Sequence, residues 1–288
     1  MKILGLAAVA IVLCSGAFAQ EPATPETVTI EAQRQRQVIE NQISTFVTAI
    51  TMPNREEALL RWHRPVCPAI VGLTKAQGEF MLARLSQAVI DTKAPLAPED
   101  CAPNFVVVAT QHPEALLQKW WDGNPRLFNS DHGIGGIKHF LAGKTPIRAW
   151  YNAELGCEEG ASRVRGGKTY TPAHCAGGMI SGGSRLTYVE VRAITSVIVV
   201  VDLEKVPELT IGQVTDYATL IGLAQIREGA DPGPAPTILH LFANSGGALP
   251  DGLSSWDRDF LKALYDTNVD GVMQIAQIKV RLDQELAR

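Results

Sequence analysis

The chain has 288 residues, 46% of them hydrophobic, with 26 Lys and Arg against 30 Asp and Glu. A net charge of −4 predicts no footprint for nucleic acid or anionic lipid, so no nucleic-acid partner is expected. The apolar share excludes disorder over most of the length, which suffices for one large domain or two small ones.

The first 19 residues have the pattern of a secretory signal peptide. Lys2 precedes an apolar run at 3–13, and residues 17–19 form an Ala-x-Ala cleavage site. The run is too short to span a bilayer, and no later run reaches about 18 apolar residues. We therefore expect an exported protein, periplasmic or extracellular, with 1–19 as the signal peptide and no membrane span.

Four cysteines follow that segment, at Cys67, Cys101, Cys157 and Cys175. An even number in an exported chain favours two disulfides. Cys67 and Cys101 lie at the starts of two apolar strand patterns with a helical pattern between them. In a right-handed βαβ unit such strand starts lie at one edge of the sheet, within bridging distance if the strands are neighbours. Cys157 and Cys175 flank a glycine-rich stretch that a bridge would close, so we predict the pairs 67–101 and 157–175.

Hydrophobic periodicity divides the first half of the chain into helices and strands. Residues 20–60 are expected to contain a short leader and an N-terminal helix. Residues 66–71 form a short apolar strand, Thr74 then caps a helix, and residues 105–109 form a buried, β-branched strand. The helix after Thr74 is predicted to have an apolar face of Phe80, Leu82, Leu85, Val89 and Ile90.

The second half alternates between apolar strands, helices and glycine-rich connections. Residues 155–185 are rich in glycine and predict a loop or ragged hairpin, in which Arg163, Arg165 and Lys168 form a basic cluster. The other expected elements are a helix from Pro113, a strand at 147–151, a one-side-exposed strand at 186–194, a central strand at 197–201, a helix at 211–226, a helix opened by a capping box at Ser254 and a last helix at 272–286.

Residues 215–225 have the spacing of a zinc-peptidase helix, H-E-x-x-H-x-x-G-x-x-H, but retain only its glycine. Thr215 and Thr219 take the places of the two histidines, Asp216 that of the general base and Gln225 that of the third ligand. These residues are not a competent ligand set for Zn²⁺, and no cysteine spacing fits C-x₂₋₄-C. We therefore expect no metal or cofactor, and a degenerate cleft lined by these four residues.

The order of elements resembles that of the metzincin-type zincins, and that of a group of uncharacterised exported proteobacterial proteins related to them. Gly222-Leu223 ends the long helix where such enzymes turn toward the third zinc ligand. Residues 253–257 with 264–265 are similar to the L-S-x-x-D … L-Y helix that follows the active site in many of these peptidases. The resemblance covers about residues 62–270.

The resemblance implies a zincin-like α+β domain over 61–288, with a mixed sheet, flanking helices and a small C-terminal helical subdomain at 229–288. Because the zinc ligands are replaced, our first hypothesis is a non-catalytic protein with a binding or envelope-associated role and an unknown protein or envelope partner. The alternative is a peptidase-like hydrolase with an unrecognised site, using Asp216 with His240 or the patch at 131–139. Zinc that survives dialysis would favour the alternative.

Overall fold

The structure is a computed structural model that describes residues 25–51, 59–128, 133–156, 163–165, 168–170, 191–243, 248–267 and 272–287. The expected signal peptide and the Cys157–Cys175 pair lie outside these residues. The chain divides into two units, residues 1–38 and 39–288, and α1 (Pro25–Ile50) contributes to both. In the first unit the side chains of residues 31–38 are exposed. No helix within the described ranges is long and apolar enough to cross a membrane.

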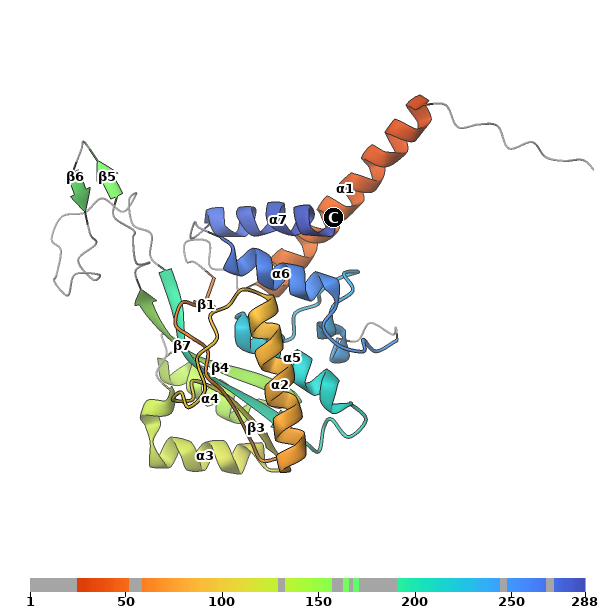
Figure 1. Ribbon diagram of the computed structural model, residues 1–288. Helices are drawn as coiled ribbons and strands as arrows, with labels where there is room; N and C mark the ends of the chain where they lie inside the picture. The colour runs from red at the N-terminus through yellow and green to blue at the C-terminus, as the bar shows by residue number, and fades with distance from the viewer. Residues whose placement is uncertain are drawn as a thin grey trace, which may run out of the picture. The chain divides into compact units, whose positions relative to one another are not determined.

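The second unit is a mixed α/β domain built on a five-stranded sheet (Figure 1). The long strand β7 (Val191–Asp202) is central, and it pairs in parallel with β1 (Arg61–Trp62) and then with β3 (Phe105–Thr110). On the far side of β3 lies β2 (Pro68–Val71), also parallel. On the other side of β7 runs β4 (Ile147–Gly156), which is antiparallel. The strands β2 and β4 therefore form the two edges of the sheet.

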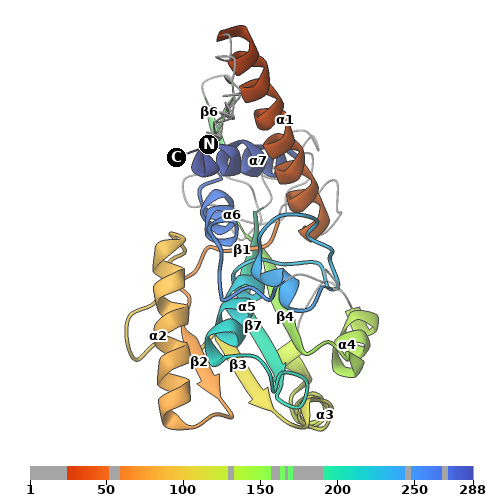
Figure 2. The same ribbon diagram turned by 90° about the vertical axis from the view of Figure 1, so that its right-hand side faces the viewer.

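Helices cover both faces of this sheet (Figures 1 and 2). One face is covered by α2 (Lys75–Asp91) and α5 (Ile211–Leu223), and the other by α3 (Pro113–Gly123) and α4 (Gly133–Ala142). Because side chains alternate along a strand, β7 supplies both cores. Its residues 197, 199 and 201 pack with α2 and α5, whereas 198 and 200 pack with α3, α4 and Trp150 of β4. The arrangement is a three-layer sandwich.

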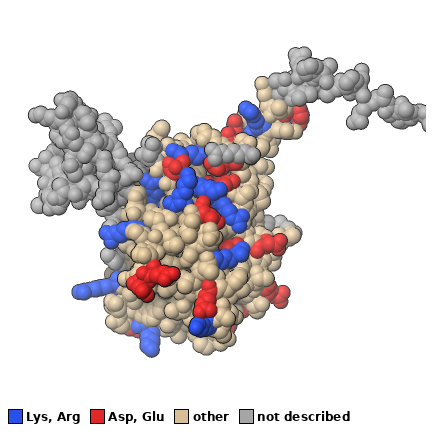
Figure 3. Space-filling view, viewed as in Figure 1, with Lys and Arg blue, Asp and Glu red and all other residues tan. Residues whose placement is uncertain are grey.

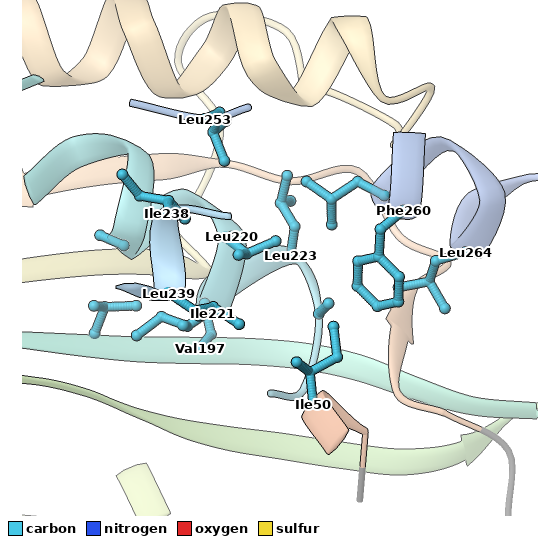
Figure 4. Close-up of a cluster of buried hydrophobic side chains, with 14 of the residues drawn as sticks. Ile50, Val197, Leu220, Ile221, Leu223, Ile238, Leu239, Leu253, Phe260 and Leu264 are labelled. Carbon is cyan, nitrogen blue, oxygen red and sulfur yellow. The ribbon is translucent and has the colours of Figure 1, made fainter. Parts of the chain in front are cut away.

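Shorter elements and two C-terminal helices complete the described chain. The helix α6 (Ser255–Tyr265) buries Phe260 and Leu264 in the same core as α5 (Figure 4), so the expected subdomain at 229–288 shares the main core. The remaining elements are the 3₁₀ helices η1 (Pro125–Phe128) and η2 (Ile238–Leu241), the hairpin of β5 (Arg163–Arg165) and β6 (Lys168–Tyr170), and α7 (Val272–Leu286).

Local capping signals predicted the helix starts well. Thr74 and Ser254 each form a capping box. The side chain of the cap accepts a hydrogen bond from the backbone N–H of the third helical residue, and the side chain of that third residue accepts one from the backbone N–H of the cap. Thr210 caps α5 in the same way with Gln213. The strand predicted at 105–109 and the helix predicted from Pro113 are also present, as β3 and α3.

Two predictions about elements were wrong. The expected strands at 186–194 and 197–201 are, in the described part, one continuous strand, β7, because Thr195-Ser196 stays extended beside β4 at the bulge after Asn152. On α2, the buried face is Met81, Leu85 and Val89, at strict i, i+4 spacing. Phe80 is 46% exposed, Ile90 55% and Leu82 38%, so these three side chains are outside the core.

The predicted Cys67–Cys101 disulfide is confirmed, with 6.0 Å between the two Cα atoms. Cys67 directly precedes β2, and Cys101 lies shortly before β3. These strands are parallel neighbours with α2 between them, so their starts lie at the same edge of the sheet. Asn104 adds to the junction by accepting a hydrogen bond from the Cys67 N–H at 2.7 Å.

The glycine of the 215–225 pattern, Gly222, is explained by packing. A Cβ at Gly222 would lie 2.0 Å from the ring of Phe105 on β3, far inside van der Waals contact. The ring of Phe105 is stacked on Trp62, whose indole N–H donates to the Gly222 carbonyl at 2.9 Å. Only a residue without a side chain lets α5 approach the sheet this closely.

Candidate functional site

Three of the four residues expected to line a degenerate cleft are buried in α5. Thr215 and Thr219 are both 0% exposed. Their hydroxyls donate to the carbonyls one turn earlier in the helix, Ile211 O at 2.6 Å and Thr215 O at 2.7 Å. With these bonds each buried hydroxyl is satisfied within its own helix, so neither faces a space that could hold a ligand.

Asp216 is the centre of a buried polar junction. Its side chain is held by Arg84 of α2 through two bonds, from Nε to Oδ1 at 2.5 Å and from Nη2 to Oδ2 at 2.7 Å. The backbone N–H of Leu253 donates to the same carboxylate at 2.7 Å. A Cβ at Gly252 would lie 2.4 Å from Oδ2, so that glycine allows the close approach. This hydrogen bonding raises the pKa of Arg84. Through these contacts Asp216 joins three segments of the fold, namely α5, α2 and the chain at Leu253.

The expectation of a cleft lined by Thr215, Asp216 and Thr219 is therefore wrong. All three side chains are buried, and their polar atoms form hydrogen bonds within α5 or with Arg84 and Leu253. Gln225, the fourth residue, lies just after the end of α5 and lines the pocket of the described chain that extends along β4 (Ile147–Gly156).

The residues of the alternative, hydrolytic site are not assembled in the described part. His240 contacts the Ala235 carbonyl through Nε2 at 2.9 Å, whereas Asp216 is bound to Arg84 and Leu253. His139 contacts Glu228 at 3.3 Å; residues 131 and 132 lie outside the described chain. No group of three or more His, Cys, Asp or Glu within the described residues has the arrangement of a metal site.

A pocket of about 800 Å³ lies along β4, the antiparallel edge strand. Figure 2 shows α4 and α5 on opposite sides of β4. The pocket is bounded by α4, by the end of α5, by residues 225–231 that follow it, and by η2. Its apolar and aromatic lining includes Phe140, Ile147, Ala149, Trp150, Tyr151, Tyr217, Ile221, Leu239 and Phe242.

The backbone of β4 presents to this pocket polar groups that no other described strand pairs. The N–H of Asp202 donates to the Pro146 carbonyl at 2.9 Å. Given the register between β4 and β7, the hydrogen-bonded pairs are then Arg148 with Val200 and Trp150 with Ile198. The N–H and C=O groups of residues 147, 149 and 151 point the other way, toward an edge that no other described strand covers. The pocket is therefore a groove along a free strand edge.

Two tyrosines form one wall of the groove. Tyr151 donates its hydroxyl to the carbonyls of Ile221 and Ala224, which fixes the end of α5 against β4. Tyr217 packs edge-on against Phe242 with 4.7 Å between ring centroids. Burial, together with the charge of Glu228, raises the pKa of Tyr217 to about 12, so its hydroxyl stays neutral and available as a donor.

The sequence patterns did not indicate this groove. They predicted a strand at 147–151, but nothing local shows that this strand lies at an edge. The one available signal was the pair Arg148 and Trp150, which places a charged and an aromatic side chain on one face of a strand that is otherwise apolar.

Comparisons with known proteins give no relative: no family model, curated protein or solved structure matches this chain.

Proposed function

We propose that the protein is a non-catalytic, exported binding protein that holds an extended peptide segment along the free edge of β4. The groove along that edge carries the proposal. An extended segment would pair with the outward N–H and C=O groups of residues 147, 149 and 151, in the manner of strand addition. The apolar and aromatic walls of the groove would receive its side chains on both faces.

The absence of an assembled catalytic group in the described part favours binding over hydrolysis. A peptidase-like reaction needs a nucleophile or activated water, a base and a group that stabilises the developing charge. Of the residues first considered, Asp216 is engaged with Arg84, whereas Gln225 and His139 line the groove, with His139 in contact with Glu228. In this proposal the resemblance to zincins reflects common ancestry. The chain keeps an antiparallel edge strand beside a helix, and that helix is now part of the core.

The partner in this proposal is a protein segment outside the cytoplasm. Lys and Arg are intermixed with Asp and Glu on the face shown in Figure 3, so that face does not favour a partner of one charge. We retain the periplasmic or extracellular location as part of the proposal, together with the signal peptide on which it depends.

Substitution of proline at residue 149 tests the proposal. The Ala149 N–H points away from β7, so Ala149→Pro removes an outward donor without breaking the sheet ladder. We expect peptides selected on the wild-type protein from a displayed random library to bind the variant about tenfold more weakly or worse, since a donor is lost and the ring obstructs pairing. Binding is measured by fluorescence anisotropy, and thermal unfolding verifies the fold.

The matched control is Ala149→Ser, which keeps the N–H and changes the side chain little. It should bind the selected peptides as the wild type does. Two results would contradict strand addition at β4. One is equal affinity of the Ala149→Pro variant and the wild type for the selected peptides. The other is failure of the library to yield any peptide that binds in the groove.

A further inference from the structure

The groove has one charged side chain whose hydrogen bonding is incomplete, that of Arg148. Arg148 is only 4% exposed and lies on the α4 side of β4, with its guanidinium 5.8 Å from the centroid of the Phe140 ring. Its Nη1 donates to the Thr145 carbonyl at 3.4 Å. The other two nitrogens, Nε and Nη2, have no partner within the described part of the chain. A buried guanidinium in this state is unusual, because a charge removed from water without hydrogen-bond partners destabilises the fold.

The acidic side chains around Arg148 are already engaged with other groups. Glu114, Asp202 and Glu228 are close enough to influence Arg148 electrostatically. Glu114, however, is bound by Lys144 at 3.0 Å, and Asp202 is bound by Lys205 at 2.7 Å. Glu228 accepts from the Thr145 hydroxyl at 3.1 Å and contacts His139 at 3.3 Å. The desolvation of Arg148 is thus not compensated by a direct partner, and burial lowers its pKa.

The same protein shows what an arginine of this kind binds when it is paired. In Arg84, the two donors on one side of the guanidinium, Nε and Nη2, hold both oxygens of the Asp216 carboxylate. The corresponding two donors are the ones left without a partner in Arg148. This side-on pair matches the geometry of a carboxylate and gives a stronger bond than a single contact.

We infer that Arg148 binds a carboxylate of the peptide held along β4. This inference rests on the proposed function, and it specifies the ligand as an acidic one. An added strand alternates its side chains between the two faces of the sheet, so every second residue lies on the α4 face with Arg148. The carboxylate is that of an Asp or Glu side chain on this face, or the C-terminus of the segment. Nε and Nη2 are shielded from solvent in the structure, and the inferred binding therefore requires the Arg148 side chain to turn toward the groove that it lines when the ligand enters.

A merely structural arginine and a ligand-binding one predict different results for the Arg148→Met variant. Methionine removes the buried charge and keeps an unbranched side chain against Phe140. Because the only hydrogen bond that Arg148 would lose is the long one to the Thr145 carbonyl, the variant should have a melting temperature equal to or above that of the wild type. If Arg148 binds the ligand, the same variant should bind acidic peptides about tenfold more weakly or worse.

The test compares peptides selected on the wild-type protein with versions in which Asp or Glu is changed to Asn or Gln, or in which the C-terminus is amidated. We expect one of these changes to cost about tenfold in affinity for the wild type and little for Arg148→Met. The position whose neutralisation has this effect identifies which kind of carboxylate is bound. Arg148→Lys, which keeps the charge but lacks the side-on pair of donors, should fall between the two and remains informative if the methionine variant does not fold.

Two results overturn the inference. One is that Arg148→Met binds the acidic peptides as tightly as the wild type does. The other is that neutralising every carboxylate costs the wild type and the Arg148→Met variant the same. If Ala149→Pro still abolishes binding in either case, strand addition stands and only the acidic specificity is wrong. If Ala149→Pro has no effect, the proposed function itself fails.

Discussion

Replacement of Asp216 by alanine should lower the free energy of unfolding by about 2–4 kcal/mol. The carboxylate is 2% exposed and accepts three hydrogen bonds, two from Arg84 and one from the Leu253 N–H. Its loss leaves the Leu253 N–H unpaired in the interior. The side chain of Arg84 is 39% exposed and can recover some hydration, so we expect less than the full loss seen for pairs buried on both sides.

Urea unfolding of the variant, followed by circular dichroism, measures this effect. Asp251→Ala is the matched control: it removes an exposed carboxylate two residues from Leu253 and should change stability by no more than about 0.5 kcal/mol. A similar small change for Asp216→Ala would mean that the junction is not formed in solution.

Removal of the Cys67–Cys101 bridge by the double change to serine should cost about 3–4 kcal/mol. The bridge closes a loop of 34 residues that contains α2, and its main effect is to restrict the unfolded chain. Because α2 carries Arg84 to Asp216, a looser α2 would also weaken the junction. The wild type is compared with the variant by urea unfolding without reductant, and a difference below about 1 kcal/mol would contradict a structural role for the bridge.

Reducing the wild-type protein provides an independent check of the bridge. Unfolding in the presence of dithiothreitol should bring its midpoint close to that of the double serine variant. The serine variant should respond to the reductant less strongly, since Cys67 and Cys101 are absent.

The predictions from sequence that were correct rest on local and short-range signals. The capping residues Thr74 and Ser254 interact with residues three positions away, and the β-branched run at 105–109 depends on its own composition. The Cys67–Cys101 pair followed from one topological rule about neighbouring parallel strands. In each of these cases the information lies within a few residues or within one supersecondary unit.

The predictions from sequence that failed concern residues whose contacts lie far away in the chain. Asp216 stands at the spacing of a catalytic base, but its partner Arg84 lies 132 residues earlier and its role follows from the packing of α2 on α5. Helical spacing is the same for a row of zinc ligands as for a row of core residues, so the pattern at 215–225 could not separate them. The edge position of β4 and the inward Arg148 depend on the order of the strands in the sheet.

Amide hydrogen exchange along β4, resolved by residue with NMR, is the most direct test of the binding edge. In the free protein, the N–H groups of Ala149 and Tyr151 should exchange much faster than those of Arg148 and Trp150, which face β7. Addition of a selected peptide should slow Ala149 and Tyr151 and leave Arg148 and Trp150 unchanged. Binding without any slowing at Ala149 and Tyr151, or with protection confined to another surface such as α2, would contradict the account.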